Sequence, residues 1–142
     1  MKTCRLMLMC VLAIAMSSQL LFAEQQCREN FTVEGGFFSG KTYKTWSAFE
    51  NIPVSKAYKQ VYRYTVKDGW HINSADKDLG MISASQQVSY GQGKTVPLNI
   101  VVEQLGKTGS KVSITYTTSG GVSSPDDAVQ KHFCATLAGV RK

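Results

Sequence analysis

Apolar and polar residues alternate along most of the second half of the chain, and this period of two predicts strands. Polar side chains occupy most of the positions between the apolar ones, which is typical of an antiparallel sheet with one buried face. The residues that share the mainly apolar face of each predicted strand are Ile82, Ala84, Gln86 and Val88; Val96, Leu98, Ile100 and Val102; and Val112, Ile114 and Tyr116.

Segments that contain glycine separate these strands and predict turns. A shorter strand comes before them, in which Trp70, Ile72 and Ser74 alternate with polar residues. The predicted turns are "ADKDLG" (75–80), "GQGK" (91–94) and "LGKTGSK" (105–111).

Helical spacing of apolar residues predicts a first helix that begins at Pro53 and ends at Asp68 and Gly69. Proline suits a first helical position, and glycine suits the left-handed conformation that follows a helix. The predicted buried stripe is Val54, Ala57, Tyr58, Val61 and Thr65, and the basic residues Lys56, Lys59, Arg63 and Lys67 fall largely on the other side.

A second helix is predicted from the stretch "SSPDDAVQKHF" (123–133). Ser124 is a suitable N-cap, Pro125 suits the first position, and two aspartates complement the helix dipole. The predicted stripe is Val129, Phe133, Leu137 and Val140, with Cys134 beside it.

Residues 41–51 form a further predicted strand, whereas residues 27–40 predict at most a short strand and a loop. The order strand, helix, four strands, helix predicts an α+β fold. We expect an antiparallel sheet of about five strands with two helices packed on one face. Residues 41–142 would form a single domain, and residues 24–40 an N-terminal segment tied to it by a disulfide.

The first 23 residues have the layout of a secretory signal peptide. Lys2 and Arg5 precede an apolar stretch, residues 6–16, and a polar segment follows. About 11 residues are too few to span a bilayer as a helix. We expect cleavage after Ala23, or a few residues away, and a periplasmic or secreted protein. An uncleaved anchor helix is the alternative.

A lipid anchor is not expected, because no cysteine follows the run of small residues that acylation requires. "EQQ" precedes Cys27 and "MLM" precedes Cys10. Cys4 and Cys10 would leave with the signal peptide, so Cys27 and Cys134 remain and an exported protein would pair them. The alternative is a buried thiol at Cys134 and a free one at Cys27.

The formal charge of +6 falls by two, to +4, when Lys2 and Arg5 are removed. The basic residues are dispersed along the chain, so no basic cluster and no nucleic-acid binding are expected. A mild positive charge weakly favours acidic partners.

The stretch "DGWHINSADKDLGMISAS" (68–85) carries one histidine and three aspartates. A calcium loop would need a ligand where Leu79 stands and a glutamate where Gln86 stands. The stretch therefore predicts the bend of a hairpin. Its residues Asp76, Lys77 and Asp78 are a candidate partner-binding turn.

No catalytic or metal site is expected. His71 and His132 lack the further ligands that zinc needs, and no nucleophile elbow is present. Nothing singles out a catalytic pair among the carboxylates. We expect no cofactor and no enzymatic activity. "NFT" at Asn30 fits a glycosylation acceptor, which matters only in a eukaryotic host.

A helix followed by "G-W-x-I", an acidic turn and "G-x-I-x-A" resembles small bacterial envelope proteins of unknown function, both periplasmic proteins and lipoproteins. The residues concerned are Gly69, Trp70, Gly80, Ile82 and Ala84. Over residues 42–140 the chain is also similar to the helix-grip modules of the outer-membrane assembly lipoprotein BamC. The resemblance implies structural residues and no catalytic ones.

We therefore expect an exported, non-catalytic binding or accessory module of the bacterial envelope, whose partner is another envelope protein. The first alternative is an immunity or inhibitor protein against a delivered toxin enzyme. The second is a carrier of a small apolar ligand held between helix and sheet.

Overall fold

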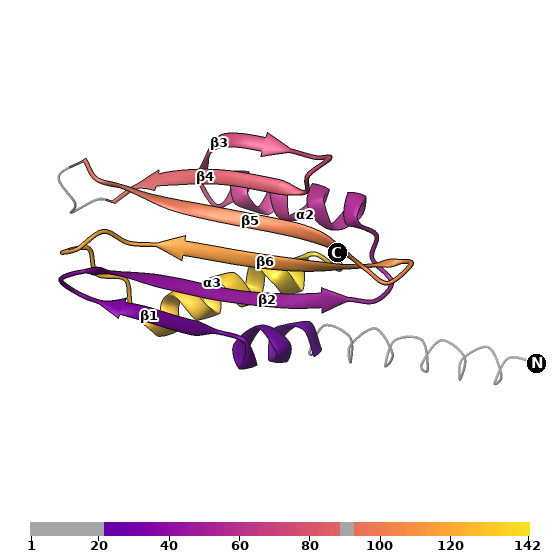
Figure 1. The fold of residues 1–142 in the computed structure, drawn as a ribbon, viewed down its shortest axis with the longest axis horizontal. Helices are drawn as coiled ribbons and strands as arrows, with labels where there is room; N and C mark the ends of the chain where they lie inside the picture. Colours follow the sequence, from indigo (N-terminus) through magenta and orange to yellow (C-terminus); the bar gives the residue numbers. More distant parts are fainter. Residues whose placement is uncertain (1–21, 89–92) are drawn as a thin grey trace, which may run out of the picture.

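The computed structural model describes residues 22–88 and 93–142. Six strands form one antiparallel sheet in the order β1-β2-β6-β5-β4-β3 (Figure 1). The strands are β1 (Thr32–Gly36), β2 (Gly40–Phe49), β3 (His71–Asp76), β4 (Met81–Gln87), β5 (Thr95–Leu105) and β6 (Gly109–Thr117).

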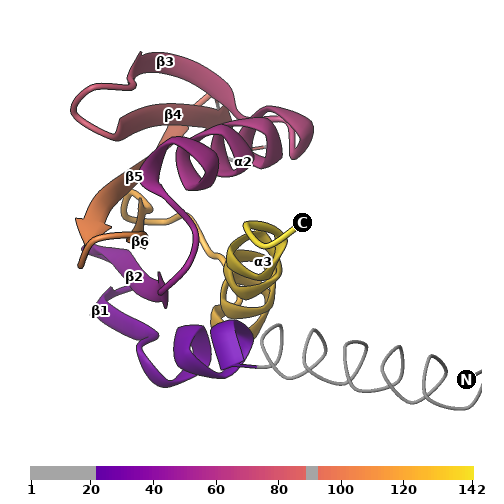
Figure 2. The same cartoon turned by 90° about the vertical axis from the view of Figure 1, so that its right-hand side faces the viewer.

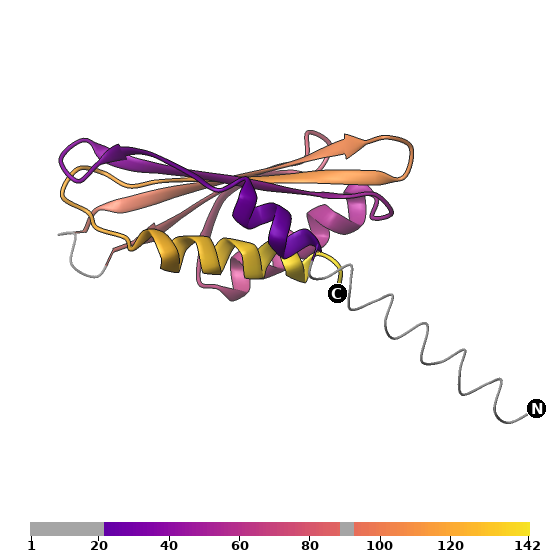
Figure 3. The ribbon, with the colours of Figure 1, turned by 90° about the horizontal axis from the view of Figure 1, so that it is seen from below.

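Three helical segments lie on the same side of this sheet, as Figures 2 and 3 show. They are residues 22–29, α2 (Val54–Lys67) and α3 (Asp126–Gly139). The predicted α+β class with an antiparallel sheet is confirmed. The expected count of about five strands and two helices is wrong, because residues 22–36 add a helix and the strand β1.

The period of two places the core where the sequence predicts it. Ile82, Ile100 and Ile114 are cross-strand partners on β4, β5 and β6, and all three are buried under the helices. Burying each such side chain stabilises the fold by roughly 1.5–3 kcal/mol. The neighbouring row, Ser83, Asn99 and Thr115, lies on the open face. The sheet therefore buries one face only.

The alternation breaks in β3, where a bulge interrupts the pairing with β4 between Ile72 and Ser74. Ile72 pairs with the buried Ala84, but Ser74 pairs with Ser83 of the open face. The expectation that Ser74 shares a face with Ile72 is wrong, because a bulge inserts one residue and reverses the side-chain direction.

Both long helices bury most of the stripes that their sequences predict, although Val54 and Val129 are only half-buried. Ala57, Tyr58, Val61 and Thr65 of α2 are buried, as are Phe133 and Leu137 of α3. Gly69 follows α2 with φ +83°, the left-handed value expected there.

The predicted N-cap of α3 is wrong. Pro125 occupies that position, and it makes no side-chain capping bond. The Ser124 hydroxyl lies instead 3.1 Å from the hydroxyl of Tyr116 on β6. The side chain of Ser124 therefore contacts the sheet instead of capping the helix.

The N-terminal helix covers the edge of β2 where β1 no longer pairs with it. The β1 pairing ends at Lys44 of β2, which leaves later backbone groups of that strand without a ladder partner. Asn30 Nδ2 donates to the Trp46 carbonyl (3.3 Å), and Gln26 Oε1 accepts from the Ala48 N–H (2.6 Å). Two amide side chains therefore bond the backbone of β2 where β1 does not reach it.

Cys27 and Cys134 form the predicted disulfide, which joins the N-terminal helix to α3 across 107 positions of sequence. Both residues are fully buried. The hydroxyl of Thr45 on β2 donates to the Cys27 carbonyl (2.7 Å), so the bridge also rests on the sheet.

We predict that replacing both cysteines with alanine lowers the free energy of unfolding by about 4–5 kcal/mol, because the bridge closes a long loop in the unfolded chain. Urea denaturation measures the loss. Reduced wild-type protein is the control and should match the double variant. A loss below about 1 kcal/mol in both would show that the bridge does not hold the fold together.

Candidate functional site

The stretch of residues 68–85 forms the β3–β4 hairpin, as predicted, with Asp76 and Asp78 at its turn, whereas Asp68 is the C-cap of α2. Asp76 Oδ1 accepts hydrogen bonds from the backbone N–H groups of Asp78 and Leu79, both at 2.9 Å. Its carboxylate therefore organises the turn itself, which is the usual role of aspartate at such a position.

The other candidate ligands do not converge. His71 is exposed on β3, while His132 on α3 lies 3.4 Å from Asp68. Within residues 22–88 and 93–142, no group of three or more histidine, cysteine or acidic side chains is placed to hold a metal ion. In the same residues, no helix is long and apolar enough to cross a membrane.

The structure gathers six basic side chains that are far apart in the sequence, so the expectation of dispersed charge is wrong. Four come from the outward side of α2, one from the β3–β4 turn, and one from the segment after α3. We call this surface the α2 basic face. Its residues are Lys56, Lys59, Arg63, Lys67, Lys77 and Lys142.

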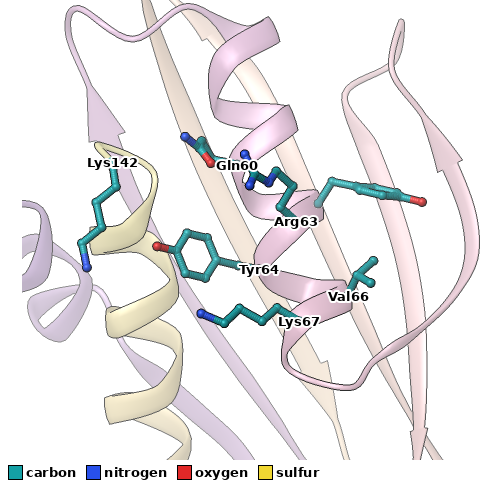
Figure 4. Close-up of a pocket in the computed structure, with 7 residues that line it drawn as sticks. Gln60, Arg63, Tyr64, Val66, Lys67 and Lys142 are labelled. Carbon is teal, nitrogen blue, oxygen red and sulfur yellow. The ribbon is translucent and has the colours of Figure 1, made fainter.

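Two open grooves run along this face and share Tyr62 and Arg63. The first has a volume of about 520 Å³ and lies between α2 and the end of α3, where Tyr64, Lys67 and Lys142 point (Figure 4). The second, of about 680 Å³, lies between α2 and the β3–β4 turn and is lined by Lys56, Lys59 and Lys77 among others.

The cations of this face have no anionic partner in the part of the chain that the structure describes. Among the described residues, none of the six lies within 4.0 Å of a carboxylate. Lys59, Arg63 and Lys67 follow one another at four-residue spacing, and α2 contains no acidic residue. Like charges at this spacing destabilise a helix. The row is thus a local cost to the fold that a bound anion would relieve.

Apolar surface lies among these cations. Tyr62 is 36% exposed and Val66 is 49% exposed. Tyr64 packs against the end of α3 at Gly139, where an added Cβ would lie 2.4 Å from the tyrosine Cζ. A small residue at this point therefore allows the ring to form one wall of the first groove.

The space between α3 and the sheet is filled by aromatic side chains. Tyr116 contacts Trp70 (centroids 5.9 Å apart), Phe133 (6.0 Å) and Tyr43 (5.5 Å). The interior void beside them measures about 10 Å³, which holds at most one water molecule. A groove of about 350 Å³ opens outside it, with Asp68 and His132 at its rim.

A buried hydroxyl and a carboxylate meet where α3 begins. Lys41 Nζ donates to Asp126 Oδ1 (2.7 Å), and the Tyr43 hydroxyl lies 3.1 Å from the same oxygen. The hydrogen bond from Lys41 lowers the pKa of Asp126, whereas burial, with Asp126 beside it, raises the pKa of Tyr43 to about 12. Near neutral pH Asp126 stays ionised and Tyr43 stays protonated, so their hydrogen bond can anchor the start of α3 to the sheet.

Sequence reasoning identified Lys77 as a candidate but missed its neighbours as a group. Asp76 and Asp78 lie at the same turn, as expected, but Asp76 is committed to backbone hydrogen bonds. The sequence does contain one sign of a basic surface, because α2 has four basic residues and no acidic one. The contributions of Lys77 and Lys142 depend on tertiary structure and are not visible in the sequence.

No protein-family model matches the chain, and no curated protein has a matching sequence. Solved structures do resemble the fold. CalU16 from Micromonospora echinospora matches with a TM-score of 0.53 at 8% identity, over 78% of this chain and 81% of that one. The conserved protein of unknown function EF2215 from Enterococcus faecalis matches with a TM-score of 0.52 at 7% identity, over 82% and 79%. At these identities the likeness establishes the fold alone, and the resemblance to BamC stays a prediction.

We predict that Asp76→Ala lowers the free energy of unfolding by about 1 kcal/mol, because two backbone N–H groups lose their acceptor. Asp78→Ala is the matched control and should change it by less than about 0.5 kcal/mol. Thermal unfolding with calcium or with a chelator should give the same midpoint. A calcium-dependent rise in the wild type that Asp76→Ala abolishes would show that the turn is a metal site.

Proposed function

We propose that this protein is an exported, non-catalytic binding module of the cell envelope, and that the α2 basic face binds an acidic segment of another envelope protein. The observation that carries the proposal is the row of unpaired cations on α2, with Tyr62 and Val66 between them. Tyrosine and arginine are enriched at the centres of protein interfaces.

Export is supported by the signal-like sequence of residues 1–23 and by the buried disulfide, since disulfides persist in oxidising compartments. A cut after Ala23 keeps Gln26, Cys27 and Asn30 in place but removes the Ala23 carbonyl, which accepts a hydrogen bond from Ser47 (2.9 Å). A cut a few residues earlier keeps this bond as well.

An inhibitor of a delivered enzyme is a second candidate function. The β3–β4 turn favours it, because Asp76 fixes the turn and presents Lys77 beside Arg63 in the second groove. Such a protein would use the same face, and the identity of the partner distinguishes the two functions. A carrier of an apolar ligand is less well supported. The void beneath α3 measures only about 10 Å³, whereas a ligand pocket needs roughly 300 Å³. The groove of about 350 Å³ beside it is large enough, but it is open to solvent and has Asp68 and His132 among its lining residues.

We predict that a fluorescent peptide rich in glutamate binds the wild-type protein, and that Lys59→Glu with Arg63→Glu raises its Kd about tenfold. Each lost charge pair at a surface contributes up to about 1 kcal/mol. Fluorescence anisotropy at low and high salt measures the change, and screening should weaken wild-type binding.

The matched control is Lys107→Glu with Lys131→Glu, which changes net charge equally on exposed residues outside both grooves. It should leave the Kd within about twofold, and both variants should keep the wild-type stability within about 0.5 kcal/mol. Equal losses in the two variants would contradict a localised site. A preference for single-stranded nucleic acid over the peptide would contradict a protein partner.

A further inference from the structure

The turn between β1 and β2 carries two exposed phenylalanines that the core does not use. Phe38 is 93% exposed and Phe37 is 52% exposed, and their rings meet edge to face with centroids 5.4 Å apart. Single exposed apolar residues are normal on a protein surface. Two adjacent aromatic rings on one turn form a local apolar surface with no partner in the described chain.

The backbone of this turn is held firmly. The Phe37 carbonyl accepts a hydrogen bond from the Gly121 N–H (2.8 Å), and the Ser39 hydroxyl accepts one from Gly36 (3.1 Å). An added Cβ at Gly120 would lie 2.2 Å from the Phe38 carbonyl oxygen, so only glycine permits this approach. The two rings are therefore presented by a rigid scaffold, and binding through them orders little additional chain.

The two chain segments that meet at Phe37 and Phe38, the Phe pair, carry no charged side chain of their own. Residues 35–40 and 118–125 contain no ionisable side chain. Lys41 at the end of this stretch is paired with Asp126 (2.7 Å). The turn can thus enter an apolar medium without burying a charge, which would be costly. Lys94 Nζ donates to the Gly120 carbonyl (3.2 Å), which places one cation beside the turn.

We propose that Phe37 and Phe38 insert into the interface of a lipid bilayer and hold the protein reversibly at a membrane surface. Two phenylalanines bury at most about 500 Å², whereas a stable dimer buries about 800 Å² per partner, so the two rings alone are too small an interface for a second copy of the chain. The two uncharged segments match the acyl region, and Lys94 matches the phosphates of the headgroups.

The Phe pair and the α2 basic face lie on different parts of the molecule. In Figure 1 the β1–β2 turn is at the left end of the sheet, and α2 lies behind its right half. The membrane contact goes beyond the proposed function and leaves the α2 basic face open to a partner protein.

The test is co-sedimentation of the full mature protein with vesicles of phosphatidylcholine, alone or mixed with phosphatidylglycerol. The wild type should bind both, weakly and reversibly. Phe37→Ser with Phe38→Ser should lower the partition coefficient at least about tenfold, since each buried ring contributes about that factor. The control, Leu79→Ser with Leu105→Ser, removes exposed apolar residues from the β3–β4 turn and from the end of β5 and should change the coefficient less than about twofold.

A second variant reports insertion directly. Phe38→Trp should retain vesicle binding, and its emission should shift to shorter wavelength when vesicles are added. Three outcomes would overturn the proposal: no binding of the wild type to either vesicle, equal binding by the Phe37→Ser/Phe38→Ser variant, or binding that only Lys59→Glu/Arg63→Glu abolishes. The proposal would also be overturned if the wild type bound no vesicles but bound a partner protein that the Phe37→Ser/Phe38→Ser variant does not bind. The two rings would then occupy a pocket of that partner protein.

Discussion

The disulfide between Cys27 and Cys134 is the interaction on which the position of the N-terminal helix, residues 22–29, depends. It fixes the helix of residues 22–29 against α3, and this helix in turn supplies Gln26 and Asn30 to the unpaired part of β2. Without the bridge, hydrogen bonds to β2 and the burial of Ala23 would hold the segment that protects this edge. Because such bonds form in oxidising compartments, the same interaction connects the fold to the proposed export.

One-sided burial of the sheet decides which surfaces remain available. All three helices crowd onto the face that carries Ile82, Ile100 and Ile114, and aromatic rings fill the space beneath α3. The void beneath α3 is small. On the outer side of α2, by contrast, basic side chains, aromatic surface and two grooves lie together. The proposed function therefore concerns a surface, and the turn with Phe37 and Phe38 adds a second surface of opposite character.

Much of the fold was predictable because burial follows a simple period. The alternation in β5 and the stripe of α2 are direct consequences of one buried face, and both predictions are confirmed. β1 was not predictable in this way, because its residues are almost all exposed and carry no alternating signal. Ser124 was assigned by local capping rules, but a contact with Tyr116 prevails. Only the α2 part of the α2 basic face could be predicted, because Lys77 and Lys142 join it only through tertiary structure.

The central claim, an exported module held together by one disulfide, is tested most directly by the intact mass of the protein from its own host, measured without reduction. The expected mass is that of residues 24–142, or of a chain that begins a few residues earlier, less two hydrogen atoms for the Cys27–Cys134 bridge. A mass that includes residues 1–23 with free thiols would contradict both export and the bridge. A chain that begins at an acylated Cys27 would contradict the bridge and indicate a lipoprotein.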